Sequence, residues 1–112
     1  MSQPCIFCRI IAQEIPAKVI ARTEDLIVIQ DIFPKAPIHY LIIPLKHTRD
    51  VVALQLADTV FGSHMLLMAQ QLAQSLPGSQ SFRLVMNNGS DSGQSVFHLH
   101  AHFLSGKQML DL

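Results

Sequence analysis

Three histidines alternate with apolar residues in the segment FHLHAHF, near the end of the sequence. Because successive side chains of a β-strand point to opposite faces, a strand here would place His98, His100 and His102 together on one face. Successive imidazoles would then lie about 6.6 Å apart, from a rise of about 3.3 Å per residue. The residues expected on the opposite face, in the core, are Phe97, Leu99, Ala101 and Phe103.

This row of imidazoles leaves three interpretations open. It could be the polar, solvated face of a strand, but that does not explain why all three polar residues are histidines. Two alternating imidazoles could instead ligate one zinc ion. A neutral imidazole could also act as a nucleophile on phosphorus while its neighbours donate hydrogen bonds to phosphate oxygens.

A loop rich in glycine and short polar residues, Asn87 to Gly93, leads directly into the histidine segment. Loops of this composition expose backbone N–H groups that suit an anion. The loop therefore favours a phosphate site. Neither a GxxxxGK(S/T) nor a GxGxxG pattern occurs, which disfavours the P-loop and dinucleotide-binding folds.

Cys5 and Cys8 form a Cys-x-x-Cys pair. This spacing suits half of a zinc site, a redox pair or two unrelated thiols. A thioredoxin-like redox pair follows a strand, and no strand pattern precedes Cys5. The redox interpretation is therefore the weakest of the three.

The elements that must position these residues follow from hydrophobic periodicity and from the turn residues. Pro16 should end a first helix, Asp58 should cap a second and Pro77-Gly78 should stop it. We expect a short helix over residues 8–14, a long helix over 58–76, and strands over 19–21, 26–29, 39–43, 82–86 and 96–104. These elements predict an α+β domain with a mainly antiparallel, five-stranded sheet.

The composition sets limits on the class of protein. The chain has 112 residues, of which 49% are hydrophobic and 14% charged, and its net charge is zero. That length suits a single domain over residues 1–112, and that balance excludes a disordered chain. Without a basic excess, nucleic acid is not an expected partner.

One long stretch, residues 59–82, contains no Asp, Glu, Lys or Arg. His64, several glutamines and Pro77-Gly78 interrupt it before it reaches the roughly 18 apolar residues of a membrane span. We therefore expect no membrane insertion. The N-terminal residues MSQPCIFCRII show no basic region followed by an apolar core and a cleavage site, so we expect a cytoplasmic protein.

At this point the sequence resembles the histidine triad (HIT) family, whose signature is His-x-His-x-His followed by apolar residues. The resemblance covers essentially the whole chain and is closest to the Hint branch, the histidine triad nucleotide-binding proteins. The matching segments, in the order of the family, are CIFCRII, EIPAK, DIFPKAP, HYLIIP and NNGSDSGQSV.

The resemblance implies a purine nucleoside phosphoramidase or nucleotidyl hydrolase, which acts on nucleoside monophosphates linked to an amine or another leaving group. His100 would attack the α-phosphorus and form a covalent nucleotidyl-histidine intermediate. His102 would bond a phosphate oxygen, with Asn87, Gln94 and Ser95 nearby. Ser95 would also help to protonate the leaving amine, and His39 would support the triad.

The nucleoside would be held by a carboxylate and an apolar pocket. By the same resemblance, Asp31 would accept the hydrogen bonds of the ribose hydroxyls. The positions at which the family builds its base pocket are Ile6, Phe7, Ile10, Ile29 and Ile32. On composition alone, each of these apolar residues would be ordinary core.

Some members of the family hold a structural zinc, and the corresponding ligands here are Cys5, Cys8, His47 and His98. Catalysis would need no metal. The alternative is that His47 is a surface residue beside Lys46 and that His98 forms a hydrogen bond within the fold.

Two other functions remain open. The chain could be a nucleotide-binding scaffold or regulatory protein with vestigial hydrolysis, or a metalloenzyme that uses His98, His100 and His102 on one zinc. His64, on the long helix, has no expected role. Hint-like proteins pair through the long helix and the neighbouring strand. A homodimer with a sheet extended across it would cover part of the weakly charged surface.

Overall fold

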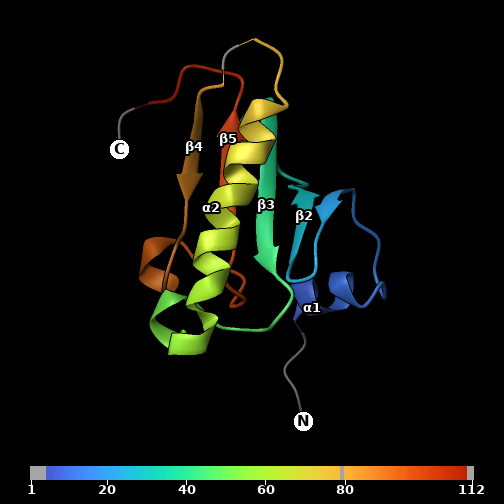
Figure 1. The fold of residues 1–112 in the computed structure, drawn as a ribbon, viewed down its shortest axis with the longest axis vertical. Coiled ribbons are helices and arrows are strands. Elements are labelled where there is room, and N and C mark those ends of the chain that lie inside the picture. Colours follow the sequence, from blue (N-terminus) through green and yellow to red (C-terminus); the bar gives the residue numbers. More distant parts are fainter. Residues whose placement is uncertain (1–4, 79, 111–112) are drawn as a thin grey trace.

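One antiparallel sheet is the frame on which the histidines are placed. A computed structural model describes residues 5–78 and 80–110. The strands are β1 (Val19–Arg22), β2 (Leu26–Gln30), β3 (Ile38–Pro44), β4 (Phe82–Val85) and β5 (Ala101–Ser105). They lie in the order β1-β2-β3-β5-β4 (Figure 1). The expected α+β class, with a five-stranded antiparallel sheet and one long and one short α-helix, is confirmed.

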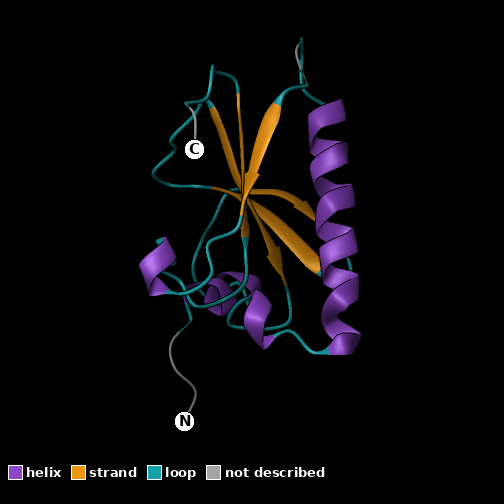
Figure 2. Cartoon of the chain, turned by 90° about the vertical axis from the view of Figure 1, so that its left-hand side faces the viewer, coloured by secondary structure: helices purple, strands orange, loops and turns teal. Residues whose placement is uncertain are grey.

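The long helix α2 (Thr59–Gln74) covers one face of the sheet (Figure 2). Its packing follows the helical period of its apolar residues. Buried residues at this contact include Met65, Met68, Leu72, Val28, Ile42, Ala101 and Phe103. Asp58 lies at the N-cap position of α2, as expected, but its side chain makes no capping hydrogen bond to this helix. Its carboxylate instead accepts bonds from the Gln55 N–H and the Lys46 ammonium, so it braces the 3-10 turn Leu56–Asp58 before the helix.

The opposite face of the sheet carries the short helix α1 (Ile6–Ile11). Its buried cluster contains Phe7, Ile27, Ile29, Leu41 and Ile43. The helix begins earlier than expected because the Cys5 sulfur accepts a hydrogen bond from the Cys8 N–H, at 3.4 Å, and so caps it. It ends before the predicted residue 14, and Gln13 has a positive φ of 64°.

The histidine segment is a strand only from Ala101 onward. Pairing with β3 stops at Ile42↔Ala101, shortly before β3 ends at Pro44. Upstream, the Leu99 N–H donates to the Thr48 carbonyl at 2.6 Å, outside the ladder. The predicted strand is therefore wrong over residues 96–100. Phe97 is 45% exposed instead of lying in the core, whereas Leu99, Ala101 and Phe103 are buried as expected.

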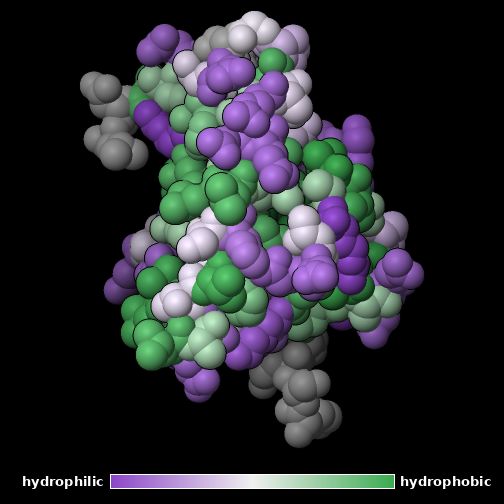
Figure 3. Space-filling model, in the orientation of Figure 1, coloured by the Kyte–Doolittle hydropathy of each residue, from purple (hydrophilic) through white to green (hydrophobic). Residues whose placement is uncertain are grey.

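The long uncharged stretch is α2 and the loop that follows it. None of the helices in the described part of the chain is long and apolar enough to cross a membrane. Figure 3 shows apolar side chains on the face of the molecule that carries α2. Exposed apolar residues of α2 and β4 are Val60, Leu66, Leu67 and Phe82.

Candidate active site and metal centre

The three alternating histidines do not form one group. His98 is fully buried and turns its ring toward a cluster of two cysteines and a second histidine. His100 and His102 line a separate cavity on the other side of the segment from the α2 core. The interpretation that all three histidines share one zinc ion is not supported by this arrangement.

The hydrogen bond of His100 fixes its tautomer. Its Nδ1 lies 2.7 Å from the backbone oxygen of His98, and because a carbonyl only accepts, Nδ1 carries the hydrogen. Nε2 is then the nitrogen with a lone pair. Burial lowers the pKa of His100, although the bond to His98 and the charge of Asp31 act in the opposite direction. His100 is therefore a neutral imidazole with a nucleophilic Nε2 at neutral pH.

A second chain of bonds fixes His39 and His102. The Lys35 N–H donates to Nδ1 of His39 at 3.0 Å, so the hydrogen of a neutral His39 is on Nε2. That Nε2 lies 2.9 Å from Nδ1 of His102 and 3.4 Å from a carboxylate oxygen of Asp31. Donation from His39 to His102 places the hydrogen of His102 on Nε2.

Burial also keeps these two imidazoles neutral. It lowers the pKa of His39, and it lowers the pKa of His102 to about 4, with the charges of His100 and His39 acting in the same direction. His102 is thus a hydrogen-bond donor through Nε2 without a positive charge of its own at neutral pH.

The cavity has a volume of about 420 Å³, within the range of about 300 to 1,000 Å³ that is typical of small-molecule sites. Most residues expected from the sequence line it. The polar ones are Asp31, Asn87, Ser95, His100 and His102. The apolar ones are Ile6, Phe7, Ile10, Ile29 and Ile32. His39 and Gln94 lie outside this lining.

Gln94 braces the loop that precedes the histidine segment. It is 4% exposed, its Oε1 accepts from the Gly89 N–H at 2.7 Å, and its Nε2 donates to the Arg49 carbonyl at 2.8 Å. Gly89 and Gly93 have φ values of 88° and 105°, which favour glycine. Gln94 therefore shapes the loop from behind.

Asp31 is held at the edge of the cavity. One of its oxygens accepts the Phe33 N–H at 2.7 Å and the other faces His39. Its side chain is 17% exposed. Since a carboxylate has about four acceptor positions, Asp31 can still accept hydrogen bonds from a ligand.

The apolar wall of the cavity has a buried part, the floor, and an exposed part, the lip. Phe7 and Ile29 are buried, whereas Ile6 is 48% and Ile32 80% exposed. Further lining residues, which the sequence did not single out, include Phe33, Leu41 and Val96. Leu41 could have been found, because it follows His39 by two residues and so lies on the same face of β3.

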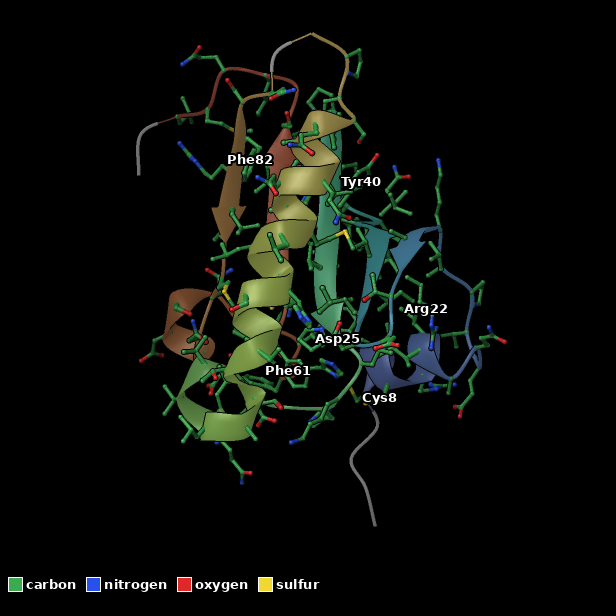
Figure 4. All side chains as sticks on the ribbon, in the orientation of Figure 1. Cys8, Arg22, Asp25, Tyr40, Phe61 and Phe82 are labelled. Carbon is green, nitrogen blue, oxygen red and sulfur yellow. The ribbon has the colours of Figure 1, made fainter. Side chains whose placement is uncertain are left out.

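The second cluster consists of Cys5, Cys8, His47 and His98, whose ligand atoms all lie within 4.8 Å of one another. Nε2 of His98 lies 2.7 Å from the Pro44 carbonyl, so it carries the hydrogen and leaves the lone pair on Nδ1, the atom that faces the cysteines. Figure 4 shows Cys8 near the C-terminal end of β3. This cluster could hold a metal ion.

Without a cation the Cys8 thiol would keep its proton at neutral pH. Burial, with a further contribution from Cys5, raises the pKa of Cys8 to about 11.

Asp31, His39 and His102 also lie within 4.8 Å of one another, but the hydrogen bond that His39 donates accounts for their proximity.

His64 has a contact that the sequence did not suggest. Its Nδ1 bonds the carboxylate of Asp25, which joins α2 to the turn between β1 and β2. It lies in neither of the clusters described above.

The sequence and the fold of this chain are similar to those of several known proteins. A family model described as the HIT domain matches residues 12–109. An uncharacterized HIT-like protein of Synechocystis is 40% identical over 107 residues, which span 96% of this chain and 94% of that protein. A solved HIT family hydrolase from Legionella pneumophila has a TM-score of 0.90 and 40% identity, and 96% of each chain is covered. Another, from Clostridium thermocellum, has a TM-score of 0.92 and 35% identity over 100% of this chain and 98% of its own.

Proposed function

The chain belongs to the HIT domain family, and we propose that it hydrolyses purine nucleoside phosphoramidates and related nucleotidyl compounds. In such substrates the α-phosphorus of a nucleoside monophosphate is joined to an amine or another leaving group. One observation carries the proposal: the bond from Nδ1 of His100 to the His98 carbonyl, which leaves Nε2 as a nucleophile at a cavity of small-molecule size.

In the first step Nε2 of His100 attacks the α-phosphorus and forms a P–N bond. The bond from phosphorus to the leaving group breaks, and its electron pair stays on the departing amine nitrogen, which takes a proton. Ser95, at the cavity wall, is the proposed donor of that proton. The Nε2–H of His102 and the amide of Asn87 are proposed to bond phosphate oxygens as negative charge shifts onto them.

In the second step water attacks the phosphorus of the nucleotidyl-His100 intermediate. A P–O bond forms, the bond from phosphorus to Nε2 breaks, and its electron pair returns to the imidazole. One proton of the water restores the Ser95 hydroxyl that protonated the amine, so the sum is one nucleoside monophosphate and one amine for each substrate and water. Because His100 is neutral before and after, each cycle begins from the same tautomer.

The nucleoside occupies the other half of the cavity in this proposal. Asp31 accepts hydrogen bonds from the ribose hydroxyls, which its fixed carboxylate can reach from the cavity edge. The base packs between the buried floor of Phe7 and Ile29 and the exposed lip of Ile6 and Ile32. Packing of the flat aromatic faces of the base on this apolar surface supplies affinity, whereas the polar groups supply orientation.

We further propose that Cys5, Cys8, His47 and His98 hold a structural zinc ion. With Zn–S near 2.3 Å and Zn–N near 2.05 Å, the ligand atoms of a tetrahedral site are separated by about 3.3 to 3.8 Å. Four of the six separations between the ligand atoms here are 3.2 to 3.6 Å, and all six are within 4.8 Å. The donor set therefore fits. When bound, the ion would cross-link α1, the end of β3 and the histidine segment.

A homodimer also belongs to the proposal. β4 is an edge strand, and Leu66 of α2 and Phe82 of β4 are exposed apolar residues. We propose that two chains pair through α2 and β4, so that the sheet continues from one chain to the other. Such a contact would cover part of an apolar surface that carries few charges.

One assay tests the proposed activity. Turnover of adenosine and guanosine phosphoramidates is measured with the wild type, with His100→Ala, and after removal of metal by a chelator. Hydrolysis that is lost in His100→Ala and persists after chelation supports the proposal. Nucleotide binding without turnover would point to the scaffold function, and hydrolysis abolished by chelation to a metalloenzyme.

A further inference from the structure

We propose that a second cavity beside the catalytic one binds the leaving group, and that Arg49 at its wall selects leaving groups that combine an apolar body with a carboxylate. This inference rests on the proposed nucleotidyl hydrolysis and names the substrate class of that same site. An amino acid with an apolar side chain, joined to the phosphorus through its amino nitrogen, has this chemistry.

The second cavity has a volume of about 500 Å³. Ile6, Ser95 and Val96 line both cavities, so the two adjoin along these residues. The remaining lining residues are Cys5, His47, Arg49 and Phe97. Most of this wall is apolar, and the exposed ring of Phe97 contributes to it. The wall therefore suits a guest with an apolar body.

The position of Ser95 indicates which part of the substrate enters this space. In a displacement at phosphorus the leaving group lies opposite the nucleophile. Asp31 and the apolar floor already account for the nucleoside, and Ser95 is the proposed proton donor to the departing amine. Because Ser95 stands at the boundary, a group that leaves on its side enters the second cavity.

The charge in this cavity comes from Arg49. Its guanidinium donates to both oxygens of Asp50, at 3.2 and 3.4 Å, which uses two of its five N–H groups. Asp50 is 5% exposed and also accepts the Ala53 N–H, so it anchors the guanidinium without enclosing it. The Arg49 side chain is 57% exposed and retains N–H groups that can bond a carboxylate.

The backbone of Arg49 is hydrogen-bonded to Gln94, which also bonds the loop Asn87 to Gly93. Its carbonyl accepts from Nε2 of Gln94, whose Oε1 accepts from the Gly89 N–H. This connection positions the Arg49 backbone relative to the loop and to Ser95, which directly follows Gln94, and Asp50 anchors the guanidinium. A carboxylate near the reacting nitrogen could therefore contact Arg49 while the phosphorus is at His100.

The contact acts only in the first chemical step. His100 bonds to phosphorus, the P–N bond to the amino acid breaks with its electron pair on nitrogen, and Ser95 supplies the proton. The amino acid then departs, so the hydrolysis of nucleotidyl-His100 by water takes place without it. Arg49 should consequently affect formation of the intermediate and leave its hydrolysis unchanged.

The test uses two substrates, adenosine 5′-phosphoramidates of phenylalanine, with either a free carboxylate or a neutral carboxamide. The proteins are the wild type, Arg49→Met, Arg49→Lys and the control Arg22→Met. Arg22 lies on β1 and lines neither cavity (Figure 4). Single-turnover measurements give the rates of formation and hydrolysis of nucleotidyl-His100.

In the wild type, formation should be faster with the carboxylate substrate. Arg49→Met should slow that formation about tenfold, the factor expected for one lost hydrogen bond between charged groups, and should leave the carboxamide nearly unchanged. Arg49→Lys should restore part of the preference, and Arg22→Met should behave as the wild type. Hydrolysis of the intermediate should proceed at the same rate in all four proteins.

Equal rates for the two substrates in the wild type would overturn the role of Arg49, and so would an equal loss for both in Arg49→Met. Those results would leave the proposed hydrolysis intact, because the substrates are still consumed. Failure of the wild type to form nucleotidyl-His100 from either substrate would instead overturn the proposed function, and this inference with it.

Discussion

Nε2 of His39 lies 2.9 Å from Nδ1 of His102, and this contact determines which nitrogen of His102 carries its hydrogen. The direction of donation is set from the backbone, because the Lys35 N–H occupies Nδ1 of His39. His102 is thereby left to donate through Nε2.

Replacement of His39 should reduce turnover through His102. His39→Leu removes the donor, so His102 no longer favours one tautomer, and we expect kcat to fall about tenfold. His39→Gln is the matched control because its amide can still donate, and it should retain more activity. Equal losses in the two variants, at equal melting temperatures, would argue against a role in tautomer selection.

Replacement of the nucleophile should separate chemistry from binding. His100→Ala should reduce turnover by about a thousandfold or more, because no covalent intermediate can form. Binding of adenosine monophosphate, measured by titration calorimetry, should change far less, since Asp31 and the apolar floor remain. Trapping of a nucleotidyl intermediate on another residue in this variant would show that His100 is not the nucleophile.

Because burial keeps these imidazoles neutral, we expect activity to persist at pH values at which a free histidine is already protonated. The pKa of His102 is lowered to about 4, and the pKa of His100 and His39 is also lowered. The acid limb of kcat/KM, after subtraction of uncatalysed hydrolysis, should therefore lie below pH 6.5. An acid limb at or above pH 6.5 would contradict the burial of these neutral rings.

The lowered pKa values of the buried histidines also make the free energy of unfolding depend on pH. A histidine with a folded pKa below its unfolded value binds protons more readily in the unfolded chain. Its contribution to stability is therefore present above about pH 6.5 and is lost as pH falls toward about 4 for His102. Urea unfolding at pH 7 and pH 5 should give the lower free energy of unfolding at pH 5.

Removal of the metal should affect folding more than chemistry. We expect about one zinc per chain after purification without chelator. Cys8→Ser should lower the melting temperature by about 10 °C, for a loss of about 2 to 3 kcal/mol. Turnover at temperatures well below the transition should persist. A metal content of zero with both thiols free would refute the assignment.

The dimer can be tested on α2. Leu66 is 64% exposed, and it lies on the opposite flank of the helix from His64, which faces Asp25. Leu66→Glu should convert the dimer into a monomer in sedimentation velocity. Leu67→Glu is the control, because Leu67 lines the groove beside Asp25 and His64. A wild type that sediments as a monomer at every concentration would exclude the dimer.

The sequence predicted the elements well because their periodicity is local. The apolar runs of β2 and β3 and the stop at Pro77-Gly78 can be recognised from neighbouring residues alone. Strand pairing is different, because it depends on distant partners: β3 continues to Pro44, but upstream of Ala101 the histidine segment leaves it and the Leu99 N–H bonds the Thr48 carbonyl. Periodicity alone therefore suggested a strand over 96–104, although pairing begins at Ala101.

Most of the residues expected in the site line one cavity, but the sequence did not indicate which atoms donate the hydrogen bonds among them. Residue types and the family resemblance brought together most of the cavity lining. The donor in each hydrogen bond depends on contacts between residues far apart in sequence, such as Lys35 N–H with His39 and His98 with Pro44. For the same reason the sequence suggested a substrate contact for Gln94, whose amide is occupied by the backbones of Gly89 and Arg49.

His98 takes part in two neighbouring sites at once, because its ring faces the cysteines and its carbonyl orients His100. A mutational scan of the three histidines should consequently yield three separate phenotypes. Variants at position 100 would fold and fail to turn over, and variants at 102 would turn over slowly. Variants at 98 would be thermolabile and scarce in the cell, so a screen that scores growth alone would mistake a folding defect for a catalytic one.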